Sequence, residues 1–178
     1  MKHLFFLSVF SVFLIPNLAF TQTTWTAYEY NISFKIKNAG IAVHGKFTGF
    51  KSEILFSPDK LSASKIKGSV DAGTLATGIN KRNNDIKDEK YLDADKYKLI
   101  EGSSIKLYTK DNDYAGLFNI TIKGVTKEIE IPFQFNQLGD LADFTGDFTL
   151  NRRDFNVGGS SMTMGDNVTV HILIKAKK

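Results

Sequence analysis

The feature that most constrains this chain is a hairpin pattern between Phe118 and Phe135. Apolar and polar residues alternate along two segments, 118–123 and 128–135, on either side of a turn at Gly124. Because successive side chains of a strand point to opposite faces, this alternation predicts two antiparallel strands, each with one buried face. Pro132 has no N–H group for a ladder, so we expect a sheet edge or a bulge there. A single hairpin is marginally stable alone, and other strands must therefore cover its apolar face.

The same alternation recurs along the chain, in the segments 31–37, 41–47, 54–56, 66–70, 105–107, 144–150 and 168–174. Turn residues such as Asn38, Gly40 and Gly139 separate these segments. Many short alternating strands predict an all-β fold, either an antiparallel barrel or a sandwich. Residues 80–98 are rich in charge and lack this period. We expect a short helical insertion there, laid across one end of the sheet, with Ile86 and Leu92 covering an opening.

The N-terminus predicts export. Lys2 and His3 precede an apolar run that is too short for a comfortable membrane span, and small residues follow it. This is the layout of a signal peptide over residues 1–21, which leaves a mature domain of residues 22–178 in the periplasm or outside the cell. The chain has no cysteine, so neither a lipoprotein anchor nor a disulfide framework is expected.

The net charge of +4 comes from lysines that mostly alternate with apolar residues. Such lysines are typical of solvent-facing strand positions. No basic block interleaved with aromatic residues is present, so nucleic acid is not an expected partner. Transient contact with an anionic membrane surface and a homodimer both remain compatible with the sequence.

Aromatic residues concentrate on the inward parity of the expected strands. Two interpretations follow. The aromatic side chains either fill the interior completely, or they line an apolar cavity for one elongated ligand, since a barrel of about eight strands is just wide enough to hold one. The pattern does not separate the two. The residues concerned are Phe34, Phe47, Phe56, Phe118, Phe133, Phe135, Phe144 and Phe148.

Residue patterns for catalysis and metal binding are sparse. His44 and His171 have no second histidine or cysteine at metal-ligand spacing, so we expect no metal site and no cofactor. No serine lies in a nucleophile elbow. Asp93 and Asp95 are more typical of a solvated turn or helix cap than of a catalytic pair. We therefore expect a protein that is not an enzyme.

The most informative polar cluster is Asn151–Phe155, which places Arg152, Arg153 and Asp154 directly after an alternating strand. One interpretation is a structural ion pair that fixes the end of the strand. The other is a polar site at the mouth of a cavity that holds a ligand head group, together with Arg82. The planar guanidinium fork of arginine suits phosphate or carboxylate.

Several motifs together resemble the YceI-like bacterial polyisoprenoid-binding proteins. They are Ile122–Lys127, Asn151–Gly158, Ala76–Gly78, and Tyr91–Asp93 followed by Tyr97, and the match extends from about Trp25 to the C-terminus. The resemblance implies a lipocalin-like antiparallel barrel of about eight strands with a helical insertion. It also implies an exported, non-catalytic protein that binds a long-chain isoprenoid or similar lipid inside the barrel.

The chain departs from the pattern of this family at a few positions. Asp85 replaces a histidine near the expected mouth, and Phe118 replaces a glycine, so that its ring is expected to intrude on the cavity. The first functional hypothesis is an exported lipid carrier, and the second is a packed barrel that acts as an envelope interaction module without a small-molecule ligand. The ligand-binding residues expected for the carrier are Phe34, Phe47, Ile54, Phe118, Ile120, Phe135, Phe148, Arg82, Arg153 and Asp154.

Overall fold

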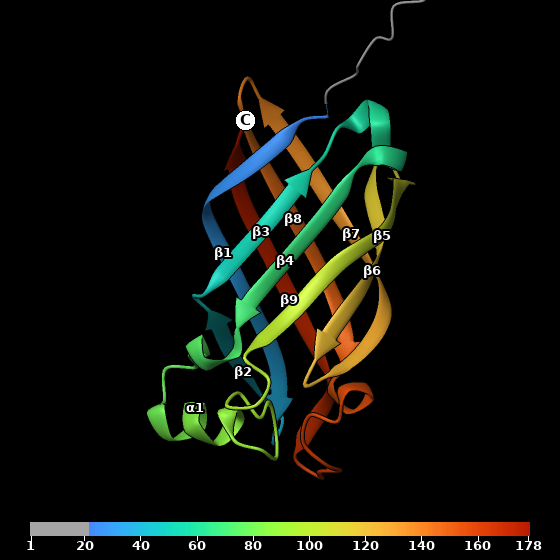
Figure 1. Cartoon of the computed structure of the whole chain (residues 1–178). Coiled ribbons are helices and arrows are strands. Elements are labelled where there is room, and N and C mark those ends of the chain that lie inside the picture. Colours follow the sequence, from blue (N-terminus) through green and yellow to red (C-terminus); the bar gives the residue numbers. More distant parts are fainter. Residues whose placement is uncertain (1–21) are drawn as a thin grey trace, which may run out of the picture.

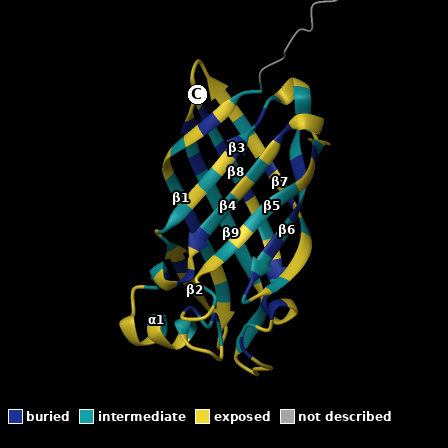
Figure 2. Cartoon of the chain, viewed as in Figure 1, coloured by how far each residue is buried: buried dark blue, intermediate teal, exposed yellow. Residues whose placement is uncertain are grey.

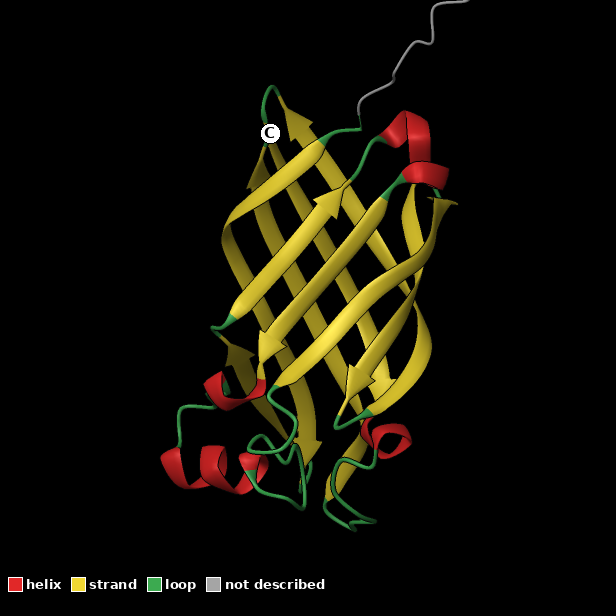
Figure 3. Ribbon diagram, in the orientation of Figure 1, coloured by secondary structure: helices red, strands yellow, loops and turns green. Residues whose placement is uncertain are grey.

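The computed structural model describes residues 22–178, and the expected signal peptide of residues 1–21 lies outside the described residues. Over this range an antiparallel sheet of nine strands curls into a barrel, and short helices lie at its two ends (Figures 1 and 3). The strands are β1 (Thr24–Asn38), β2 (Ile41–Phe47), β3 (Phe50–Leu55), β4 (Lys65–Asp71), β5 (Leu99–Lys110), β6 (Asp113–Ile122), β7 (Val125–Leu138), β8 (Leu141–Asn151) and β9 (Met164–Lys177). The helices are η1 (Pro58–Ala63), η2 (Ala72–Thr74), α1 (Asn80–Lys87) and η3 (Arg152–Phe155).

The barrel closes because β1 also pairs with β9, the last strand of the sheet. Strands β1 and β3 to β9 form the closed barrel of eight strands, and β2 is an additional strand on the second half of β1. The expected all-β antiparallel barrel is therefore confirmed. Each alternating segment of the sequence lies in or overlaps one of the nine strands, because alternation marks a strand with one face buried.

The central hairpin forms as β6 and β7, from Tyr114↔Phe133 to Ile122↔Val125. Its two-residue turn has positive φ at Lys123 (50°) and Gly124 (73°). Such turns match the twist of the flanking strands, which explains the glycine. Strand β7 pairs with β8 only from Phe133 to Leu138. Pro132 therefore lies at the point where β7 becomes an edge, as its missing N–H group predicts.

The short helical insertion expected within residues 80–98 is confirmed. Helix α1 ends at Lys87, and turns connect it to β5. Three short 3-10 helices, which the alternation did not indicate, also occur among residues 22–178. Strand β4 ends at Asp71, which caps η2 by accepting a hydrogen bond from the Gly73 N–H.

The solid part of the core lies at the end of the barrel that holds η1 and the C-terminus, opposite α1. Six aromatic rings pack there, which we call the aromatic plug: Trp25, Phe56, Tyr114, Phe133, Phe135 and Phe144. Phe56 is completely buried, and its ring centroid lies 4.8 Å from that of Phe135 and 5.6 Å from that of Phe144.

Buried residues alternate with exposed ones along the strands (Figure 2). No helix within residues 22–178 combines the length and apolarity that crossing a membrane requires.

Candidate functional site

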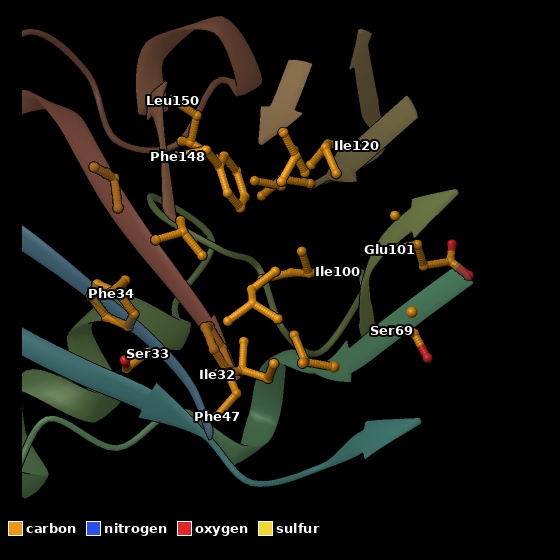
Figure 4. Close-up of a pocket in the computed structure, with 18 of the residues that line it drawn as sticks. Ile32, Ser33, Phe34, Phe47, Ser69, Ile100, Glu101, Ile120, Phe148 and Leu150 are labelled. Carbon is orange, nitrogen blue, oxygen red and sulfur yellow. The ribbon is translucent and has the colours of Figure 1, made fainter. Parts of the chain in front are cut away.

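The candidate site is a cavity of about 290 Å³ inside the barrel, between the aromatic plug and α1. Its wall is almost entirely apolar. Ile54, Phe144 and Ile174 lie toward the plug, and Ile86, Tyr91 and Met164 lie toward α1. Figure 4 shows Ile32, Phe34, Phe148 and Ile120 around the space, while the side chains of Ser69 and Glu101 point away from it. An apolar pocket of this kind buries apolar ligand surface.

Inward-facing glycines leave room for this cavity. Gly68 of β4 and Gly102 of β5 are direct partners across the ladder, and Gly146 of β8 also lines the cavity. At these positions the barrel has no side chain where its interior would otherwise be filled. The inward parity therefore holds both aromatic residues and gaps, and the interior is only partly packed.

Phe118 stands where the YceI-like pattern has glycine, and its ring is expected to intrude on the cavity. In the structure it does not fill the space. Its ring folds over Gly116, two residues earlier on the same face of β6. A Cβ atom at Gly116 would lie only 2.5 Å from Phe118 Cε2. Phe34 packs in the same way against a glycine of the neighbouring strand, because its ring covers Gly45, its direct partner in the ladder. Both aromatic rings thus lie along the wall instead of across the cavity.

The structure brings six of the expected ligand-binding residues to the cavity wall, namely Phe34, Phe47, Ile54, Phe118, Ile120 and Phe148. Phe135 lies in the aromatic plug, where its ring centroid is 5.5 Å from that of Trp25. The three polar residues Arg82, Arg153 and Asp154 are not part of the wall. Their roles in ligand binding remain predictions.

Each polar residue has a local setting. The Arg82 guanidinium donates to Thr77, at Oγ1 (2.9 Å) and at the carbonyl oxygen (2.8 Å), and so fixes the turn before α1. Arg153 Nη1 lies 3.4 Å from Asp166 Oδ2 at the surface. Asp154 is exposed in the first turn of η3.

Arg152, which the sequence places only within the cluster Asn151–Phe155, is a buried residue of the cavity wall. Its side chain is 3% exposed and lines the cavity. Every guanidinium nitrogen donates within the protein, to the carbonyl oxygens of 157–159, 164 and 165 and to Asp166 Oδ1 at 2.8 Å. Gly158, with φ +66°, permits this approach, because a Cβ atom there would lie 3.0 Å from Arg152 Nη1. Arg152 thus holds residues 157–166, which form the loop before β9 and the start of β9, at the α1 end.

The parity of β8 contained the signal for this residue. Phe144, Gly146, Phe148 and Leu150 point inward, and Arg152 has the same parity. Arg152 closes this end of the cavity. Because its N–H groups all donate to acceptors of the protein, it has no free donor for a head group. The interior is therefore suited to an apolar chain alone. Within residues 22–178 no buried side-chain nitrogen or oxygen lacks a hydrogen-bond partner.

The titration shifts lie on the outer wall. A hydrogen bond from the Lys110 ammonium lowers the pKa of Glu130, and the Glu130 carboxylate raises the pKa of Tyr108 and of Lys110. The Glu29 carboxylate, 2.9 Å from Lys175 Nζ, raises the pKa of Lys175. These groups face solvent and do not tune the cavity. Among the residues that the structure describes, no three His, Cys, Asp or Glu side chains converge as metal ligands.

A closed antiparallel barrel with an apolar interior cavity defines the class of lipocalin-like binding proteins. The chain belongs to the YceI-like domain family, whose profile matches residues 24–176. It is 32% identical over 142 residues to the UPF0312 protein of Pseudomonas syringae pv. syringae, covering 74% of this chain and 73% of that one.

Two solved structures share the fold. BcnA of Burkholderia cenocepacia superimposes with a TM-score of 0.80 at 22% identity, covering 83% of this chain and 96% of that one. A polyisoprenoid-binding domain from Saccharophagus degradans, implicated in plant cell wall breakdown, gives a TM-score of 0.64 at 12% identity. That match covers 86% of this chain and 97% of that domain.

Proposed function

We propose that this protein is an exported carrier that sequesters the apolar chain of an isoprenoid or similar amphiphilic lipid inside its barrel. The observation that supports it is the almost entirely apolar cavity, which lies between the aromatic plug and the segment that Arg152 holds. Burial of apolar ligand surface would supply the affinity, at about 25 cal/mol per Å² before the costs of ordering. The polyisoprenoid-binding relative in fold is consistent with this ligand class.

The hypothesis of a packed barrel without a ligand is less well supported. It requires the aromatic side chains to fill the interior, whereas Phe34 and Phe118 lie along the wall over glycines. A catalytic role has still less support. Asp95 pairs with Lys98 at the surface, and Asp154 is exposed outside the cavity wall. We therefore propose a binding protein that performs no chemistry on its ligand.

Native mass spectrometry of the purified mature protein, followed by solvent extraction, tests the proposal. We expect one long-chain lipid species to co-purify in near-stoichiometric amount. A protein that is free of lipid, and stays so after incubation with quinones, polyprenols and fatty acids, would contradict the carrier function.

A substitution in the wall gives a second test. We predict that Phe148→Asp abolishes lipid retention in a folded barrel, because a carboxylate in the cavity either stays charged in an apolar site or draws in water. Thr149→Asp is the matched control, since Thr149 is the exposed next residue of β8 and should tolerate a charge. Lipid content is measured by extraction, and folding by circular dichroism. Retained lipid in Phe148→Asp would move the binding site elsewhere.

A further inference from the structure

The barrel wall has a break between β1 and β3. Strand β1 pairs with β3 only at Thr24↔Leu55 and Trp25↔Ile54, and with β2 only from Ile32 onward. Between these points residues 26–31 of β1 pair with neither β2 nor β3. Residues 50–53 of β3 pair with β4 on one side and have no partner on the side of β1. The strands therefore diverge, and no backbone hydrogen bonds close the wall there.

A slot of about 600 Å³ occupies this break, lined by residues 24–28, Tyr30 and residues 50–55. Phe50 and Ile54 line both the slot and the interior cavity. Only side chains thus separate the interior from the surface. The rings of Tyr30 and Phe50 are in contact, tilted by 53° with centroids 5.1 Å apart, and the Tyr30 O–H donates to the Thr48 carbonyl oxygen.

The other openings of the barrel are more firmly closed. Strands β7 and β8 also separate, beyond Phe133↔Gly146, but there η3 packs against β7 and buries Phe155 to 1% exposure. The aromatic plug fills one end. At the other end Leu92 is buried and Arg152 pins the loop. A strand ladder or a buried plug must break to open these places, whereas the rings that meet across the slot, Tyr30 and Phe50, are only partly buried and can change rotamer at lower cost.

We propose that the slot is a lateral portal, through which the apolar chain of the ligand enters the barrel between β1 and β3. This inference rests on the proposed carrier function and specifies the route of that ligand. Tyr30 and Phe50 are the gate residues, because their rings, one from each of the diverging strands, are in contact across the break. The cavity wall is almost entirely apolar and the donors of Arg152 are used within the protein, so the head group remains in the slot at the surface while the chain lies in the cavity.

Cross-linking across the slot tests the portal. Tyr28 and Lys51 both line the slot and are exposed, and the chain has no native cysteine that would compete with introduced thiols. Tyr28→Cys with Lys51→Cys, joined by a short bismaleimide, holds β1 against β3. The probe is the fluorescent fatty acid cis-parinaric acid, with equilibrium titration for affinity and stopped-flow fluorescence for rates.

We expect the cross-link to slow both association and dissociation by about tenfold or more, while the Kd changes much less, because the route is blocked and the cavity is unchanged. The matched control is Ser69→Cys with Glu101→Cys, which are direct ladder partners on β4 and β5 with outward side chains. The same reagent there should leave the rates unchanged.

Widening the gate gives an independent measurement if the cross-linked protein does not fold. Tyr30→Ala should raise both rates with little change in Kd, and Tyr30→Phe, which keeps the ring, should stay close to wild type. Unchanged rates in both the cross-linked protein and Tyr30→Ala, with binding intact, would overturn the portal and leave the carrier function standing. Absence of probe binding to the wild-type protein would overturn the carrier function and the portal together.

Discussion

At the scale of single residues, Arg152 shows how a buried charge stabilises one end of a binding cavity. Its guanidinium donates to six acceptors, of which three are carbonyl groups of the loop before β9 and two are carbonyl groups of the first residues of β9. Buried polar groups are costly when they lose a partner, and here one side chain satisfies several of them at once. The loop therefore depends on Arg152 more than on any single contact of its own.

We predict that Arg152→Ala lowers the free energy of unfolding by roughly 3 kcal/mol, because it removes a buried guanidinium and leaves the carbonyl groups that it binds without this partner. Its neighbour is the control. Arg153 is half exposed and pairs with the same Asp166, so Arg153→Ala should cost less than about 1 kcal/mol. Urea denaturation measures both. Equal effects of the two substitutions would mean that Arg152 does not hold the loop.

At the scale of elements, alternation in the sequence predicted the strands well, because each strand has one face in the interior. Parity alone gives the face of a side chain and not its depth along the barrel axis. Phe135 and Phe148 share the inward parity, yet Phe135 lies in the aromatic plug and Phe148 lines the cavity. Depth depends on register between strands far apart in sequence.

The same limit applies to the breaks in the wall. The partner change of β1 from β3 to β2 leaves no mark in the alternation of either strand. The parity of β8 places Arg152 on the inward face. A buried arginine there is expected only when its hydrogen-bond acceptors are known, and the alternation does not show them. These come from a loop up to 14 residues further along the chain.

The division of the interior into a plug and a cavity leads to a prediction on two phenylalanines. Phe56→Ala should lower the free energy of unfolding by about 3–5 kcal/mol, because Phe56 is fully buried among aromatic rings, but it should leave affinity for cis-parinaric acid nearly unchanged. Phe148→Ala should lower the affinity for cis-parinaric acid and change the free energy of unfolding much less, because Phe148 is partly exposed and lines the cavity. Urea denaturation and fluorescence titration measure the two quantities. Loss of affinity in Phe56→Ala alone would place the ligand in the plug.

At the scale of the whole molecule, the described residues 22–178 form a closed barrel, and the first of them take part in it. Thr23 and Trp25 already hold the strand ends at η1, through the Phe56 N–H to Thr23 carbonyl bond (3.0 Å) and the Trp25 Nε1 to Phe56 carbonyl bond (2.9 Å). The first residues after the expected cleavage site are thus part of the fold. This is consistent with a leader that serves targeting and is then removed.

We predict that the exported protein begins at Gln22, and that residues 22–178 expressed without the leader remain in the cytoplasm with the same stability. The physical reason is that Thr23 and Trp25 already hold the start of β1 against the end of β3, so that residues 22–178 contain the contacts that close the barrel. Intact mass measurement of the protein from the periplasm and the culture medium gives the first residue, and urea denaturation compares the two forms. Retention of residues 1–21 in the protein outside the cytoplasm, or a shorter form that fails to fold, would contradict the proposed processing.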